Sequence, residues 1–200
     1  MASNAGNLRH TLLRLQHRDL SMREELAQDG SLYHGYHPRM EAVHRDNANE
    51  LREIIKQVGW PNEQLVGRDG AEAAWLIAQH AISEPGFMRT CCELLDREVA
   101  AGRVPAWQFA YIYDRVRVSE GLPQRYGTQF EVTPDGPRLC STEDPESVNA
   151  RRLSVGLGTV AEHLVRLQGG PYPTAEQYQA RKAEEKAWRI KVGWIGADDA

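Results

Sequence analysis

The segment AAWLIAQHAI, residues 73–82, constrains the fold most, because it is apolar on every side when it is wound as a helix. A helix of this kind has to lie inside a protein core, so other elements must surround it. Gln79 and His80 are the only polar residues in the segment. A buried histidine is either neutral or paired with a carboxylate, and both states suit proton exchange near neutral pH. The segment therefore predicts a helical core that contains a titratable group.

Apolar residues at helical spacing predict further helices around this segment. The first carries Leu8, Leu12, Leu15, Met22 and Leu26, with Asp19 and Arg23 on its polar side, and ends before Gly30. Further helices are expected from His37-Pro38 to about Val58, from Ala71 to about Ile82 behind an Asp69/Glu72 cap, from Pro85 to Gly102, and over 106–119. For the 106–119 segment, Tyr111-Ile112-Tyr113 would also fit a β-strand.

After residue 121 the pattern changes from helical to strand-like. Pro134-Asp135-Gly136-Pro137 predicts a turn between strands at 126–133 and 138–141, and capped helices follow after Asp144, Thr159 and Thr174. The expected fold class is therefore mainly α, a single-domain helical bundle with a small β-hairpin after the fifth helix. We expect one globular domain over 1–192 and a flexible tail over 193–200.

The composition is that of an ordinary globular protein and excludes several function classes. The 200 residues carry 24 Lys and Arg against 28 Asp and Glu, a net charge of −4, and no basic stretch that would track nucleic acid. No apolar run reaches the ~18 residues of a membrane span, and the N-terminus has no signal-peptide core, so a cytoplasmic protein is expected. Cys91, Cys92 and Cys140 fit neither a zinc pattern nor a disulfide framework and are expected to be free thiols.

Polar residues interrupt the apolar stripes of two further helices. His44 and Asn47 fall on the stripe of the second helix, and Glu41 lies at its edge. In the fifth segment Asp114 shares a row with Trp107 and Tyr111, which predicts a buried carboxylate that needs a partner. Each of these side chains could instead be purely structural, buried with its hydrogen bonds satisfied. Titratable groups on three helices nevertheless predict one polar pocket.

Several strings of the sequence carry a family resemblance. They are HPRMEAVHRDNA (37–48), GWP with LVG (59–67), AAWLIAQHA (73–81), DRVRVSEGLPQRYGTQ (114–129) and RRLSVGL (151–157). Over about residues 37–165 the chain resembles an uncharacterised family of bacterial proteins known only as a domain of unknown function. The resemblance implies no activity.

The resemblance does imply a set of signature positions. They are Glu41, His44, Gln79, His80, Asp114, Arg115, Glu120, Gln124, Tyr126, Gly127, Thr128 and Gln129. After the QHA string the family continues with a small acidic or polar residue, whereas this chain has Ile82-Ser83. A carboxylate beside His80 would then have to be Asp114 or Glu41.

The leading hypothesis is a small-molecule enzyme that uses metal-independent general acid–base chemistry, of the lyase, cyclase, isomerase or hydrolase type. The expected catalytic residues are His80, Asp114, His44 and Glu41. The expected substrate-binding residues are Gln79, Arg115, Glu120, Gln124, Tyr126, Thr128, Gln129, Asn47 and Tyr111. No cofactor is expected. The sequence has no serine-hydrolase elbow, phosphate-binding loop or dinucleotide fingerprint, which disfavours a serine hydrolase, a nucleotide-triphosphate enzyme and a classical dehydrogenase.

Two alternatives remain open at this point. Glu41 and His44 have the i, i+3 spacing of carboxylate metal sites, so a metal enzyme with Glu41, His44 and His80 as ligands is possible. A non-catalytic binding module is the other alternative. The last helix is mostly charged, and Trp188, Ile190 and Trp194 could form a homodimer contact.

Overall fold

The structure is a computed structural model that describes residues 2–33 and 35–197. The described residues form eight α-helices and one two-stranded antiparallel hairpin after the fifth helix, which confirms the predicted fold class. Residue contacts group the chain into two compact units, Met1–Val104 and Pro105–Ala200, where the sequence led us to expect a single domain over 1–192. Each unit is described by itself. None of the described helices combines the length and apolar character needed to cross a membrane.

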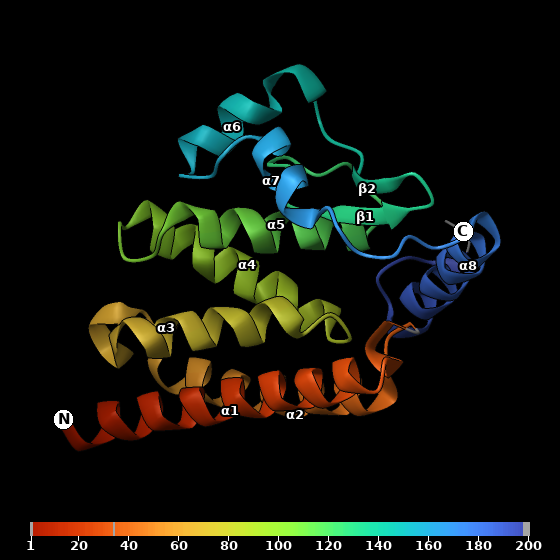
Figure 1. Cartoon of the computed structure of the whole chain (residues 1–200). Coiled ribbons are helices and arrows are strands. Elements are labelled where there is room, and N and C mark those ends of the chain that lie inside the picture. Colours follow the sequence, from red (N-terminus) through yellow and green to blue (C-terminus); the bar gives the residue numbers. More distant parts are fainter. Residues whose placement is uncertain (1, 34, 198–200) are drawn as a thin grey trace. The chain divides into compact units, whose positions relative to one another are not determined.

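The first unit is built from helices alone. It contains α1 (Ala2–Gln28), the short 3-10 turn η1 (Ser31–Tyr33), α2 (Pro38–Val58), α3 (Glu63–His80) and α4 (Pro85–Ala100). Helices α1, α2 and α3 run side by side, as Figure 1 shows from red to yellow. Their apolar stripes face one another, and Leu12, Leu15, Leu51 and Ile77 are fully buried between them.

Helix α3 begins earlier than the sequence predicts. The Asn62 side chain caps it by accepting the Leu65 N–H at 3.3 Å, so the helix starts at Glu63 rather than Ala71. Gly67 then interrupts it with a φ of +74°, a conformation that favours glycine. Beyond this kink the small side chains of Ala73, Ala74 and Ala78 are buried, which lets the neighbouring helices approach closely.

The second unit combines helices with the hairpin. It contains α5 (Ala106–Ser119), β1 (Phe130–Thr133), β2 (Gly136–Leu139), the 3-10 turn η2 (Pro145–Ser147), α6 (Val148–Ser154), α7 (Val160–Leu167) and α8 (Ala175–Val192). The 106–119 segment is a helix and not a strand. The hairpin is shorter than predicted, because residues 124–129 form a loop before β1.

Capping explains where the last helices begin. Thr159 and Thr174 each form the predicted capping box, with Glu162 and Gln177 respectively. Helix α8 then lies along the hairpin, where the Tyr178 hydroxyl donates to Glu131 Oε2 at 2.9 Å. Trp194, within the segment expected to be a tail, is buried.

Candidate active site

Asp19, in the middle of α1, is completely buried. The prediction that places it on the polar side of the first helix is wrong. The buried stripe of α1 runs through Leu8, Leu12, Leu15 and Leu26, and Asp19 lies on the same stripe, four residues after Leu15 and seven before Leu26. A buried carboxylate needs partners that replace water.

Two histidines from different helices supply these partners (α1, α2 and α3 in Figure 1). His80, the last residue of α3, places Nδ1 2.9 Å from Asp19 Oδ2 and 3.0 Å from Oδ1. His44 of α2 places Nε2 3.2 Å from Asp19 Oδ2, a close electrostatic contact whose angle is poor for a hydrogen bond. The two imidazole centroids are 5.1 Å apart. The carboxylate is therefore shared by two imidazoles.

A chain of hydrogen bonds continues from His44 away from the carboxylate. The Tyr36 hydroxyl lies 2.7 Å from His44 Nδ1, and the Ser83 hydroxyl hydrogen-bonds Tyr36. Arg45 Nε donates to Ser83 Oγ at 3.4 Å. Ser83 accepts from Arg45 and still has its own proton to donate, and its bond to Tyr36 favours the phenolate, as a donated bond does. In this arrangement Tyr36 donates to His44 Nδ1. This direction assigns the Nε2–H tautomer to His44, with that N–H turned toward Asp19.

Charges and burial fix the protonation of two groups at this site. Burial alone would raise the pKa of Asp19, but the close contacts and charges of His44 and His80 outweigh burial and hold the pKa well below its ordinary value. Burial raises the pKa of Tyr36, so its hydroxyl keeps its proton and stays a donor. Asp19 is thus a permanent anion beside two groups that can carry a proton.

Two other predicted residues of this unit, Asn47 and Glu41, have partners of their own. Asn47 is buried and structural, because its Oδ1 accepts from Arg18 Nε at 2.8 Å and its Nδ2 donates to the Leu15 carbonyl. Glu41 Oε1 forms an ion pair with Arg45 Nε at 3.6 Å. The carboxylate that contacts His80 is therefore Asp19, and not Glu41 as one prediction has it.

The same three side chains could hold a metal ion. Asp19, His44 and His80 each offer one donor atom, and these atoms all lie within 4.8 Å of one another. Two imidazoles and one carboxylate are a common ligand set for Zn²⁺ and other transition metals. Asp19 takes the place that the sequence analysis gives to Glu41.

Asp114 of α5 is buried as predicted, but its partners belong to a loop of its own unit. Its Oδ1 accepts the backbone N–H of Arg125 at 2.8 Å, and Oδ2 accepts the N–H of Thr128 at 2.9 Å and its hydroxyl at 3.0 Å. The Tyr126 N–H adds a further bond at 3.0 Å. Burial raises the pKa of Asp114 against the pull of these donors. All these bonds end within residues 125–128, so Asp114 fastens that loop.

Arg152 of α6, which the sequence analysis missed, holds the same loop by its carbonyl groups. It is fully buried and donates to the carbonyl of Gly127 in the loop and to that of Gly158 after α6, both at 2.5 Å. Gly127 has a φ of +65°, and a Cβ there would lie 2.9 Å from Val148 Cγ2. The loop is thus fixed by a carboxylate on its N–H groups and a guanidinium on its carbonyls.

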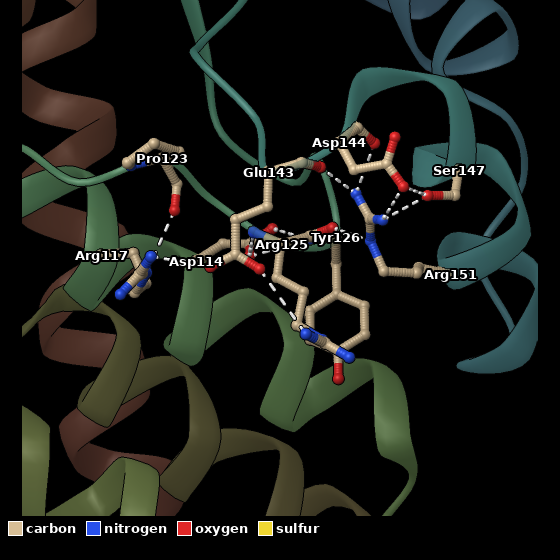
Figure 2. Close-up of polar contacts among 9 residues, drawn as sticks. All are labelled: Asp114, Arg117, Pro123, Arg125, Tyr126, Glu143, Asp144, Ser147 and Arg151. Carbon is tan, nitrogen blue, oxygen red and sulfur yellow. Dashed lines mark hydrogen bonds and ion pairs between the residues drawn. The ribbon is translucent and has the colours of Figure 1, made fainter.

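Neighbouring arginines and glutamines complete this framework. Arg151 donates to the carbonyl of Arg125 at 2.6 Å, and Arg117 donates to the Pro123 carbonyl at 3.0 Å. Figure 2 shows both arginines beside this loop. Arg117 also pairs with Glu143 at 2.7 Å. Most of the predicted binding residues lie in this unit, on α5, at its end or in the loop. They are Tyr111, Arg115, Glu120, Gln124, Tyr126, Thr128 and Gln129. The hydrogen bonds of the loop explain why the side chains of Gln124 and Thr128 are buried.

Within the first unit, the structure brings two of the predicted catalytic residues together. His44 and His80 meet at Asp19, while the residues from 111 to 129 belong to the second unit. Sequence reasoning missed Asp19, Tyr36 and Ser83. The spacing of Asp19 along the α1 stripe was the available signal, and the aromatic linker before α2 contained Tyr36.

Comparison with known proteins gives a family but no activity. A family model described as a family of unknown function (DUF6624) matches residues 6–174, a wider span than the resemblance over 37–165. A search of curated proteins and a search of solved structures each gave no match.

Proposed function

Because the chain belongs to this family of unknown function, its activity has to be inferred from the site, and we propose that it is a small-molecule enzyme using general acid–base chemistry at His80. The observation that carries the proposal is the bond from His80 Nδ1 to the buried Asp19. With its proton on Nδ1, the imidazole has its lone pair on Nε2, the atom that would accept a proton from a substrate.

Exposure supports this division of roles. The His80 side chain is 24% exposed, whereas that of Asp19 is 1% exposed. His80 is thus the member of the pair that a substrate can reach, and Asp19 is a positioning residue that stabilises the imidazolium formed when His80 takes a proton. His44, held by Tyr36, is the second group that can carry a proton.

Several reaction classes need no more than this. Eliminations, cyclisations, isomerisations and hydrolyses all proceed with one positioned base and its conjugate acid. A covalent route through Cys91 is disfavoured, because burial raises the pKa of that thiol and keeps it protonated. We therefore keep the lyase, cyclase, isomerase or hydrolase class with a polar substrate.

The test compares metabolite extracts incubated with the protein and with His80→Gln. The exposed residue His17 supplies the matched control His17→Gln on α1. We expect the unaltered protein and the control to deplete the same metabolite, and His80→Gln to leave it. Identical extracts from all three proteins would refute the acid–base proposal and favour the non-catalytic binding module.

A metal-dependent enzyme is the second candidate, and one observation favours it. His44 Nε2 is buried beside the carboxylate but lacks a well-directed hydrogen bond. If Tyr36 accepted rather than donated, Nε2 would present a lone pair to a cation shared with Asp19 and His80. Such an ion would supply a Lewis acid and an activated water.

Metal analysis separates the two candidates. Protein purified without chelator should contain less than a tenth of an equivalent of transition metal if the acid–base proposal holds. A metal content near one equivalent that His44→Ala abolishes would establish the second candidate instead.

A further inference from the structure

Gln79 is a buried amide whose two polar atoms have no hydrogen-bond partner among the described residues. The residue is 3% exposed, and both Oε1 and Nε2 are shielded from solvent. Roughly 90% or more of buried polar groups in proteins are paired, so an amide with both ends unpaired requires an explanation.

A second buried glutamine in the same chain shows what such an amide normally does. Gln124 accepts the Gln129 N–H at 2.8 Å and donates to the carbonyls of Gln129 and Cys140 at 2.9 and 3.0 Å. Both ends of the Gln124 amide are used, and its partners include the N–H and the carbonyl of a single residue. A buried glutamine is thus complementary to a group that offers one donor and one acceptor side by side.

The position of Gln79 relates its amide to the proposed active site. It immediately precedes His80, so their Cα atoms are about 3.8 Å apart. The His80 side chain remains partly exposed, whereas the Gln79 side chain is buried. Consecutive side chains on a helix point about 100° apart, so a ligand that binds both residues has to extend from the Gln79 amide to His80 around the end of α3.

We infer that Gln79 recognises an amide-like group of the substrate, meaning a carboxamide, ureido or lactam group with a donor next to an acceptor. The inference rests on the proposed function in placing this recognition beside His80. The paired donor and acceptor of the ligand would satisfy both ends of the Gln79 amide at once. A ketone or an ester lacks the donor, and binding of either would leave the Gln79 oxygen unpaired.

Two matched substitutions distinguish a ligand-binding amide from a structural one. Gln79→Leu removes an amide that forms no bonds within the described protein, so we expect an unchanged or higher melting temperature. Gln124→Leu removes an amide with three bonds, so we expect a clear decrease. A decrease for Gln79→Leu as large as that for Gln124→Leu would show that Gln79 is structural and would overturn the inference.

Binding is then measured directly by NMR on ¹⁵N-labelled protein with acetamide as the probe and acetone as its matched control. The Gln79 side-chain NH₂ signals are identified by their loss in Gln79→Leu. We expect acetamide, in the millimolar range usual for so small a ligand, to shift these signals and acetone to leave them unmoved. No shift with acetamide, or equal shifts with both probes, would refute the inference.

The result does not depend on turnover. Shifts with acetamide and no His80-dependent change in metabolite extracts would keep the inference and reject the proposed enzyme. A metabolite consumed equally by the unaltered protein and Gln79→Leu, with the same KM, would keep the proposed enzyme and reject the inference about Gln79.

Discussion

Replacing Asp19 by Asn should destabilise the protein far more than its small change in shape suggests. Both carboxylate oxygens lie 2.9–3.0 Å from His80 Nδ1, so whichever way the new amide turns, its NH₂ faces a ring N–H. The variant loses a charge-assisted bond and leaves a buried donor unpaired. Bonds to charged groups contribute about 1.5–3 kcal/mol and an unpaired buried donor costs about 1–3 kcal/mol, so we expect a loss of roughly 2–4 kcal/mol in unfolding free energy.

This loss is measurable by thermal and urea unfolding at neutral pH. For a chain of this size, about 1 kcal/mol corresponds to ~2–4 °C, so the melting temperature should fall by roughly 5–15 °C. Asp46, exposed on α2, supplies the control, because Asp46→Asn should stay within about 0.5 kcal/mol. Metabolite turnover, where found, should fall by about 10²–10⁴-fold in Asp19→Asn, since His80 loses its positioning partner.

The pH dependence gives an independent check with a definite sign. The folded-state pKa of Asp19 is lowered from its ordinary 3.8, so ionised Asp19 stabilises the fold fully above that value. This contribution is lost as the pH falls from about 3.8 through the lowered folded pKa. The stability difference between the two proteins should therefore shrink only in that acidic range. Equal melting temperatures at neutral pH, or a difference that grows in acid, would refute the assignment.

Three further predictions concern other groups. Asp114→Asn should destabilise the protein by about 2–4 kcal/mol and speed amide hydrogen exchange at residues 125–128, since an NH₂ would face loop N–H groups; unchanged exchange there would contradict the role of this side chain. Cys91 should react with a thiol reagent at mildly alkaline pH only after unfolding, because it is buried with a raised pKa, and rapid reaction of the native protein would contradict this. Tyr36→Phe removes the donor to His44 Nδ1 and should cost about 1 kcal/mol; ¹⁵N shifts of that ring should show loss of the Nε2–H tautomer, and an unchanged tautomer would refute the direction of the chain.

The helices of the first unit were predictable because their apolar residues recur at helical spacing. The site was not, because its central residue carries a charge and a charged side chain is normally assigned to the surface. Asp19 can be buried because His44 and His80, distant along the chain, lie against it. The spacing of residues along one helix gives no information about a contact with another helix.

The second unit shows the opposite case. The burial of Asp114 was predictable from its row on α5, yet its partners are backbone N–H groups of a loop about a dozen residues later. Backbone donors are present at every residue and leave no mark in a sequence. The glycine at 127 was the only local sign that the chain turns there with a positive φ.

Comparison of the two buried carboxylates explains why the chemistry is assigned to one of them. Asp19 and Asp114 are equally buried and accept bonds of similar length, near 2.9 Å. The pKa of Asp19 is lowered while that of Asp114 is raised by burial. The difference lies in the donors. Backbone N–H groups neither gain nor lose protons, so around Asp114 they can only fix geometry. The imidazoles around Asp19 can fix geometry and can also gain or lose a proton. A proton taken up by His80 is therefore stabilised by the negative charge that Asp19 already carries.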